Sequence, residues 1–147
     1  MAKQPHEIVG NWVSYRKDIR VLDCTIRDGG LMNDSHFDDA TVRAVYDACV
    51  AAGIDYMEIG YKNSQRLFAP GKYGPWRHCK EDDIRRIVGD NETSLKLAAI
   101  ADAEKSDYHT DILPKAQSPL SLIRVAAYIH QIPLALDMIK DAHDKGY

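Results

Sequence analysis

The sequence predicts an α/β fold with a parallel β-sheet, and three observations lead to this fold class. Strand-like and helix-like segments alternate along the chain. The strand-like segments are apolar on both faces, as is typical of a parallel sheet that is covered on each side. They begin near residues 19, 55, 94 and 121, and this spacing of about 34 residues is the size of one βα unit.

The first unit joins a predicted buried strand at 19–26 (IRVLDCTI) to a predicted helix at 36–54. In that helix, apolar residues recur with the 3.6-residue period, and Gly53 provides a C-terminal stop. The second unit has a short strand at 55–61 (DYMEIGY) and a helix at 79–91 that a glycine closes.

The third unit has a predicted strand at 94–102, followed at 105–119 by a short helix or a 3₁₀ turn. The fourth has a strand at 121–129 and a helix at 133–147, with Pro near its start and Gly near its end. The segment 61–79 (YKNSQRLFAPGKYGPWRHC) interrupts this pattern, because it is long, aromatic and rich in Gly and Pro. It follows the C-terminal end of a strand, where α/β proteins place functional loops.

Four units allow two architectures, a complete small open sheet or the N-terminal half of a TIM (β/α)₈ barrel, which needs roughly 250 residues. The last residues, IKDAHDKGY, have the form of a helix and a turn that feed another strand. We therefore favour the half-barrel. The expected organisation is an N-terminal extension at 1–18 and a partial (β/α) barrel domain at 19–147.

Composition narrows the functional classes. The chain has 147 residues, of which 45% are hydrophobic and 28% charged, and its net charge is −3. Lys and Arg form no basic run, so nucleic-acid binding has no electrostatic support. No apolar segment approaches the length of about 18 residues that a membrane span needs. The three cysteines lie far apart without zinc spacing, which indicates a reducing compartment, and we expect a cytoplasmic protein.

Charged residues lie where the first two predicted strands end. Arg27-Asp28-Gly29-Gly30 closes the first strand, and Glu58 stands inside the apolar run of the second. Asp28 could bind a hard divalent cation through oxygen, and Arg27 offers a fork of donors to a carboxylate or a developing enolate. A buried Glu58 needs a partner, a metal or a raised pKa. The plainer interpretation is a capped turn and an ion pair, but adjacent parallel strands bring these groups to one rim.

These residues resemble a known family. The segments DCTIRDGG (23–30) and MEIG (57–60) look like the first two strands of the DRE-TIM metallolyases. That superfamily includes 4-hydroxy-2-oxovalerate aldolases, HMG-CoA lyase and the isopropylmalate and homocitrate synthases. The likeness is closest to the aldolase-type members, which carry a glycine- and aromatic-rich segment near a cysteine, here KYGPWRHC (72–79). The resemblance covers 19–147.

The resemblance implies a TIM barrel with a divalent metal, Mn²⁺ or Mg²⁺. It assigns Asp28 as a metal ligand, and Arg27 and Glu58 as catalytic residues: Arg27 stabilises an enolate and Glu58 supports the site. Members of the superfamily cleave or form a carbon–carbon bond next to the carbonyl of a 2-oxo acid, and the metal polarises that carbonyl. An aldehyde is the partner in the aldolase-type reaction.

Two departures from the family pattern stand out. The remaining metal ligands of the family are a His-x-His pair on a late strand, and this sequence has no His-x-His. The hydroxyoxovalerate aldolases also have a proton-transferring His three residues after the metal-binding Asp, where this chain has Leu31. His36 or a residue of the 61–79 loop could take that role.

Other residues are candidates for substrate binding. Tyr61 and Asn63 follow the second predicted strand and could contact a substrate or belong to an ordinary loop. Arg124 is a charged residue in an otherwise apolar strand, so it points into a barrel lumen or to a sheet edge. His130 follows that strand and could reach the rim or be a solvated loop histidine.

The leading hypothesis is a metal-dependent aldolase or carbon–carbon lyase acting on a 2-oxo acid. One alternative is an acyl-CoA-condensing synthase of the same superfamily, similar to isopropylmalate synthase, since both chemistries pass through the same enolate. Another is a non-catalytic half-barrel that acts by self-association, because half a barrel has two open strand edges. The expected partners are a 2-oxo acid and an aldehyde, with the barrel completed by homo-oligomerisation or by a missing C-terminal half, and with no nucleic acid or membrane.

Overall fold

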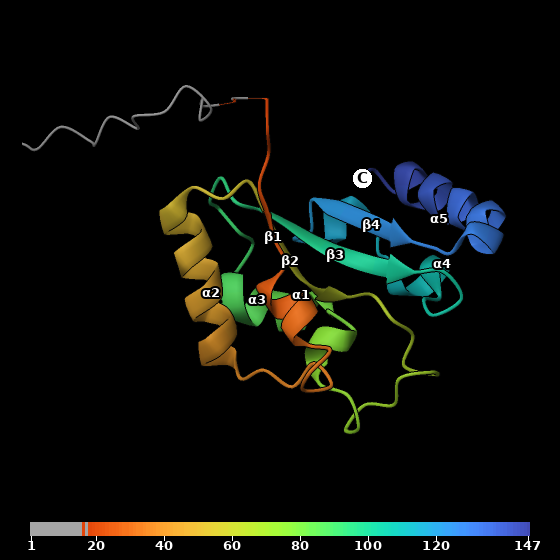
Figure 1. The fold of residues 1–147 in the computed structure, drawn as a ribbon, viewed down its shortest axis with the longest axis horizontal. Helices are drawn as coiled ribbons and strands as arrows, with labels where there is room; N and C mark the ends of the chain where they lie inside the picture. The colour runs from red at the N-terminus through yellow and green to blue at the C-terminus, as the bar shows by residue number, and fades with distance from the viewer. Residues whose placement is uncertain (1–15, 17) are drawn as a thin grey trace, which may run out of the picture.

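The computed structural model describes residues 16 and 18–147, so most of the predicted extension at 1–18 lies outside the described residues. Four parallel strands form one sheet in the order β1-β2-β3-β4 (Figure 1). They are β1 (Leu22–Asp23), β2 (Tyr56–Tyr61), β3 (Lys96–Asp102) and β4 (Leu122–Ala126). Each strand pairs with the one before it in the chain, which confirms the predicted parallel α/β fold and matches the strand order of half a barrel.

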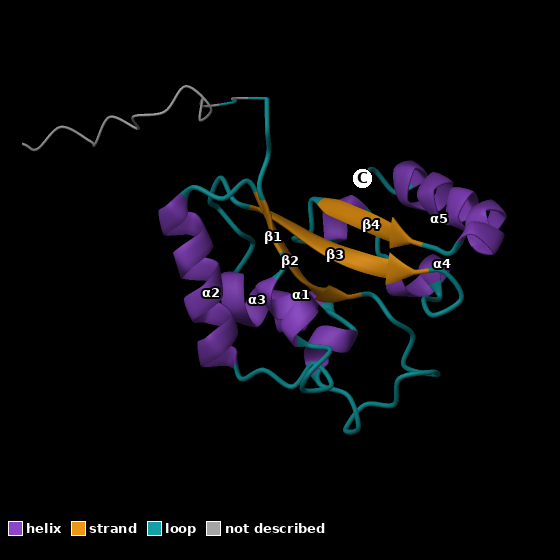
Figure 2. Ribbon diagram, in the orientation of Figure 1, coloured by secondary structure: helices purple, strands orange, loops and turns teal. Residues whose placement is uncertain are grey.

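Helices connect these strands, as Figure 2 shows. The α-helices are α1 (Thr25–Gly29), α2 (Asp39–Ala52), α3 (Glu81–Val88), α4 (Tyr108–Asp111) and α5 (Ile132–Asp144). Three 3₁₀ turns are η1 (Pro75–Arg77), η2 (Lys115–Gln117) and η3 (Ile129–Gln131). None of the described helices combines the length and the apolar character that crossing a membrane requires.

The predicted helices at 36–54, 79–91 and 133–147 are confirmed as shorter helices, the last of which begins one residue earlier, at Ile132. Asp38 begins α2 by accepting the backbone N–H of Thr41 at 2.6 Å, and Gly53 ends it in the left-handed conformation, with φ of 68°. The segment 105–119 contains both expected forms, a short helix and a 3₁₀ turn.

The prediction of a strand over 19–26 is confirmed only for Leu22–Asp23. The strand ends at Asp23, whose carboxylate accepts both the backbone N–H and the hydroxyl of Thr25, at 3.0 and 2.8 Å. Such side-chain bonds to the following backbone compete with strand pairing. The chain turns instead into α1, so Arg27 and Asp28 lie on a helical turn beyond the strand. The fourth strand likewise ends at Ala126 rather than 129.

The hydrophobic core lies between one face of the sheet and the helices. It contains Met57 and Ile59 of β2, Leu97 and Ala99 of β3, and Ile123 of β4. Because side chains alternate along a strand, the opposite face carries another set. In register on that face are Glu58 with Ala98, and Ile100 with Arg124. In a half-barrel this second face is the lumen side.

The segment that follows β2 packs tightly over the turn after α1. The backbone N–H of Gly74 donates to the carbonyl of Asp34 at 2.9 Å. A Cβ atom at Gly74 would collide with the backbone carbonyl of Ser35, so only glycine allows this approach. Trp76, fully buried, holds the loop in the core. The loop therefore forms a fixed wall beside the carboxyl ends of β1 and β2.

Candidate active site

Glu58 is the centre of a charged cluster on the lumen side of the sheet. Its side chain is fully buried (0% exposed). Arg27 donates from Nε to Oε2 at 2.6 Å, and Arg124 donates from Nε to Oε1 at 2.8 Å and from Nη2 to Oε2 at 2.6 Å. The Cys24 thiol lies 3.6 Å from Oε2. Helix α1, strand β2 and strand β4 thus bring three charged residues to one point.

The buried Glu58 carboxylate is flanked by two cations. Burial acts to raise the pKa of Glu58, but hydrogen bonds from Arg124 and Arg27 outweigh it and lower this pKa below its ordinary value. For Arg27, burial acts to lower the pKa, but hydrogen bonding to Glu58 outweighs it and raises the pKa. Hydrogen bonding to Glu58 also raises the pKa of Arg124. All three groups are therefore charged at neutral pH, and one carboxylate faces two guanidinium groups.

Asp28 is a second anion of the candidate cluster. Its Oδ1 lies 2.5 Å from Nη1 of Arg27, and its side chain is 58% exposed. The side chains of Arg27 and Arg124 are 18% and 40% exposed, so both remain accessible beside the buried Glu58. This arrangement can hold an anion that displaces or accompanies Asp28 next to two fixed guanidinium groups.

The predicted metal ligand does not belong to a complete metal site within the described residues. No three His, Cys, Asp or Glu side chains there are grouped to hold a metal ion. The oxygens of Glu58 are engaged by arginines. Asp28 is exposed and is a ligand of the right type for Mg²⁺ or Mn²⁺, but one carboxylate is not a binding site for either.

Two predicted substrate-binding residues lie beneath the rim. Tyr61 is buried, and the guanidinium carbon of Arg77 lies 4.4 Å from its ring centroid. Asn63 is also buried, and its Nδ2 donates to Oδ2 of Asp102 at 3.3 Å. Both side chains support neighbouring residues in the structure, and their contact with a substrate stays a prediction.

Arg77 was not singled out from the sequence. It is buried, and besides Tyr61 its guanidinium carbon faces the rings of Phe68 and Tyr73 at 5.3 and 5.4 Å. Its Nη2 lies 3.4 Å from the carbonyl oxygen of Gly30, and Nε has no partner among the described residues. Arg77 thereby connects the 61–79 loop to the Arg27-Asp28-Gly29-Gly30 turn. The density of aromatic residues around an arginine in this loop was the available signal.

A second buried ion pair secures the base of the same loop. The ammonium group of Lys62 donates to Glu81 Oε1 at 2.7 Å and to the carbonyl of Cys79 at 2.8 Å. Ser118 donates to the same oxygen of Glu81 at 3.1 Å. Burial raises the pKa of Cys79 to about 12, so this thiol is not a nucleophile at neutral pH. We assign this network a structural role.

Comparison with known proteins identifies one relative in sequence and one similar structure. No family model matches the chain. A protein of Mycobacterium tuberculosis (strain ATCC 25618 / H37Rv) named oxaloacetate decarboxylase is 29% identical over 130 residues, which are 86% of this chain and 36% of that protein.

A crystal structure of the N-terminal domain of a Bacteroides vulgatus protein, for which an aldolase function has been suggested, is similar with a TM-score of 0.71. The identity is 24%, over 88% of this chain and 42% of the other. The chain therefore spans less than half the length of each of these proteins. Its fold is that of this N-terminal domain, and its parallel strands match half of a TIM-like barrel.

Proposed function

We propose that this chain carries part of the active site of an aldolase or carbon–carbon lyase that acts on a 2-oxo acid. The observation that carries the proposal is the pair of accessible guanidinium groups, Arg27 and Arg124, fixed by the buried Glu58. The names of the two similar proteins, an oxaloacetate decarboxylase and a suggested aldolase, support the same class of reaction.

Guanidinium groups can stabilise both negative charges of such a reaction, which are the substrate carboxylate and the enolate oxygen. Arg124 can bind the carboxylate of a 2-oxo acid through the donors that Glu58 leaves free. When the neighbouring carbon–carbon bond breaks, its electrons move towards the 2-oxo carbonyl and an enolate forms. Arg27, fixed by Glu58 and Asp28, can donate to that oxygen without reorganisation, which lowers the barrier. Decarboxylation and aldol cleavage both produce this enolate, so one cluster serves either reaction.

Glu58 acts as the residue that positions the two arginines. Its lowered pKa makes it a poor proton acceptor, and its two oxygens are engaged. The proposal assigns no proton transfer to it. Leu31 stands where the hydroxyoxovalerate aldolases have a histidine. It is exposed, and its side chain has no ionisable group that could transfer a proton.

Among the described residues, the proposal assigns the binding of a divalent cation to Asp28 alone. This carboxylate would be one ligand of Mn²⁺ or Mg²⁺, the 2-oxo acid would add its own oxygens, and further ligands would come from polypeptide outside the described residues. When bound, such a cation polarises the 2-oxo carbonyl. An acyl-CoA-condensing synthase stays the alternative within the same chemistry.

A second candidate function is assembly into a complete barrel, and a separate observation supports it. Strand β4 pairs only with β3 in the described sheet, so one edge is open. Helix α5 next to it exposes an apolar stripe, formed by Ile129 just before the helix and by Ile132, Leu136 and Ile139. An open edge beside exposed apolar residues favours association. We propose that a second copy or the other half of a barrel covers it.

The experiment that tests the proposed reaction is a binding titration monitored by NMR. Oxamate, a stable analogue of the pyruvate enolate, should shift the signals of Arg27 and Arg124, and Arg124→Gln should weaken binding about tenfold, the worth of one charge-assisted hydrogen bond. Arg43→Gln, an exposed arginine of α2, is the matched control and should leave the affinity unchanged. Equal affinity in wild type and Arg124→Gln would contradict the proposal.

A further inference from the structure

A small cavity lies away from the arginine cluster, between the loop that follows β2, the start of α3 and the short helix α4. Its volume is about 150 Å³, and none of its lining residues belongs to the cluster around Glu58. The polar side chains of its lining are those of Lys62, Asn63, Gln65, His78, Lys80, Glu81, Thr110 and Asp111. The proposed reaction uses none of these residues except as support for the loop.

One imidazole nitrogen in the wall of this cavity lacks a partner. The side chain of His78 is buried, with 8% of the residue exposed. Its Nδ1 lies 2.8 Å from the backbone carbonyl oxygen of Asn63. Because a carbonyl oxygen can only accept, Nδ1 carries the proton, and the neutral ring has its lone pair at Nε2. Nε2 is buried and has no hydrogen-bond partner among the described residues.

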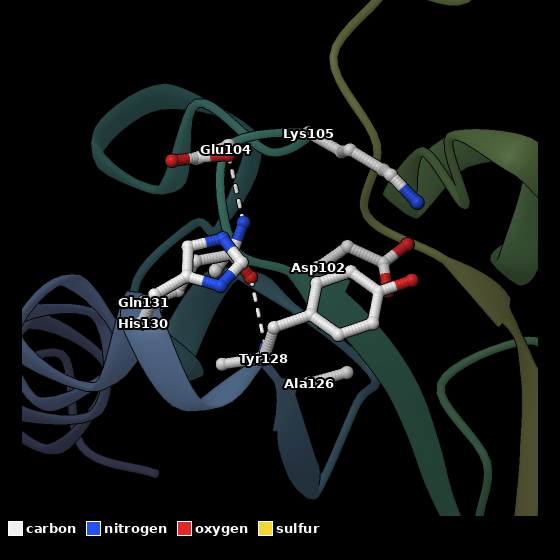
Figure 3. A pocket seen from close by; sticks show the side chains of 9 residues that line it. Asp102, Glu104, Lys105, Ala126, Tyr128, His130 and Gln131 are labelled. Carbon is white, nitrogen blue, oxygen red and sulfur yellow. Dashed lines mark hydrogen bonds between the residues drawn. The ribbon is translucent and has the colours of Figure 1, made fainter.

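Figure 3 shows His130, whose surroundings are different. This histidine lines another cavity, between the loops that follow β3 and β4, and it is exposed. Water reaches an exposed imidazole and satisfies its nitrogens. His78 is shielded from bulk water, so its Nε2 needs a partner inside the cavity that it lines.

Asp111 adds a carboxylate to the lining of the same cavity. Its Oδ2 accepts the backbone N–H of Asp107 at 2.7 Å, and no ion pair to it is formed within the described part of the chain. Burial raises the pKa of Asp111, because the carboxylate loses water without gaining a cation. The cavity therefore combines a free imidazole lone pair with a carboxylate that has no counter-ion.

The lysines of the lining leave room for a cation. The ammonium group of Lys62 lies 2.7 Å from Oε1 of Glu81, so these two charges balance each other. Lys80 is exposed, and its flexible side chain can keep the ammonium group in water. With both lysines accounted for, the carboxylate of Asp111 is the charge that a ligand would neutralise.

The two free groups together favour a transition-metal ion. An imidazole whose Nδ1–H donates to a backbone carbonyl is the usual arrangement of a metal-binding histidine, because it directs Nε2 to the metal. Imidazole nitrogen with carboxylate oxygen suits Zn²⁺, whereas Mg²⁺ and Ca²⁺ prefer oxygen ligands alone. The described residues contain no group of three ligands, so water would complete the coordination, and the cavity has room for several water molecules.

We propose that this cavity binds Zn²⁺ or a similar divalent transition-metal ion through Nε2 of His78 and the carboxylate of Asp111. The ion joins the 61–79 loop to α4 and has no part in the proposed reaction. It is separate from the Mn²⁺ or Mg²⁺ ion assigned to Asp28, since the two sites share no residue. Because the ligands come together only in the folded chain, binding stabilises the fold.

The test is a calorimetric titration of the chain with Zn²⁺, with the imidazole signals followed by NMR. His78→Gln and Asp111→Asn should each weaken binding by about tenfold or more. Asparagine at 111 can still accept the backbone N–H of Asp107, so this variant should fold even if His78→Gln does not. His109→Gln is the matched control, because His109 is exposed and lies 3.1 Å from Asp141, and it should leave the affinity unchanged.

Thermal unfolding gives a second measure. Zn²⁺ should raise the unfolding midpoint of the wild-type chain and of His109→Gln, and should raise that of Asp111→Asn much less. Absence of Zn²⁺ binding by the wild-type chain would overturn the proposal and leave water as the partner of Nε2. Binding that is lost in His109→Gln and kept in Asp111→Asn would assign the ion to the exposed His109–Asp141 pair, and would overturn it as well.

Discussion

Arg124 contacts both carboxylate oxygens of Glu58, from Nε at 2.8 Å and from Nη2 at 2.6 Å, although 66 residues separate the two in the sequence. The contact crosses β3, since Glu58 lies on β2 and Arg124 on β4. The strand between them contributes Ala98 and Ile100 to the same face, and neither can form an ion pair with Glu58 or Arg124. The ion pair therefore joins the two halves of the sheet across the lumen face.

Loss of the Glu58 charge should destabilise the fold strongly. Glu58→Gln leaves two guanidinium groups close together without their buried counter-ion, which costs about 3–5 kcal/mol in comparable cases. Urea denaturation followed by circular dichroism measures the free energy of unfolding. Glu92→Gln, at an exposed position, is the matched control and should change it by less than about 0.5 kcal/mol. A loss below 1 kcal/mol for Glu58→Gln would contradict the central role of this residue.

The same carboxylate predicts a pH dependence. Burial acts to raise the pKa of Glu58, but hydrogen bonds from Arg124 and Arg27 lower it from the ordinary 4.5. Its contribution to stability is thus fully present above pH 4.5 and is lost as the pH falls through the lower, folded-state pKa. The stability difference between wild type and Glu58→Gln, measured from pH 7 to pH 3, should shrink only below pH 4.5. A difference that is constant over this range would exclude the linkage.

The buried Arg77 should tolerate an apolar replacement better than a conservative one. Arg77→Lys keeps the charge, but an ammonium group is strongly hydrated and cannot stack on the rings of Tyr61, Phe68 and Tyr73. Arg77→Met removes an unpaired buried charge and fills a similar volume. We expect a loss of about 2 kcal/mol for Arg77→Lys and less than about 1 kcal/mol for Arg77→Met. The reverse order in thermal unfolding would show that the charge itself stabilises the loop.

Metal binding by the chain alone should be weak. Within the described residues no three potential metal ligands are grouped, so calorimetry should give a dissociation constant for Mn²⁺ above about 1 mM. Oxamate brings two oxygens of its own and should strengthen binding at least threefold in wild type, but not in Asp28→Asn. Asp34→Asn, in the loop nearby, provides the control for loss of surface charge. Micromolar Mn²⁺ binding without oxamate would reveal ligands that this arrangement lacks.

The apolar stripe of α5 predicts self-association when no other half of a barrel is present. Sedimentation equilibrium should give a mass above the 16.5 kDa of one chain. Leu136→Glu should weaken this association at least tenfold, because it places a charge in the middle of the stripe. Arg43→Glu changes an exposed residue of α2, outside the stripe, and should leave the association unaffected. A wild-type chain that stays monomeric at millimolar concentration would exclude the assembly proposal.

Much of this architecture could be predicted from the sequence, because it depends on periodicity. The strands at 55–61 and 94–102 and the helix at 36–54 carry patterns that tertiary packing reinforces. A carboxylate inside an apolar run also indicated that Glu58 needed a partner. The identity of Arg124 as that partner depends on strand register, which no local pattern determines.

Other features could not be predicted from local sequence patterns. The hydrogen bonds that Thr25 donates to the Asp23 carboxylate end the first strand early, where the apolar run alone suggested continuation. The environment of Arg77 depends on how a long loop folds back on itself. The catalytic roles of Arg27, Asp28 and Glu58 stay predictions, although the structure brings these side chains together.

The sequential order of the strands has a consequence for synthesis. Each new strand pairs with the one made immediately before it, so the sheet can grow strand by strand as the polypeptide leaves the ribosome. Glu58 and Arg27 emerge first, and Arg124 follows after 66 more residues. Until β4 docks, the carboxylate has one cation and open solvent beside it. Glu58 therefore gains both of its cationic partners only when the fourth strand is in place.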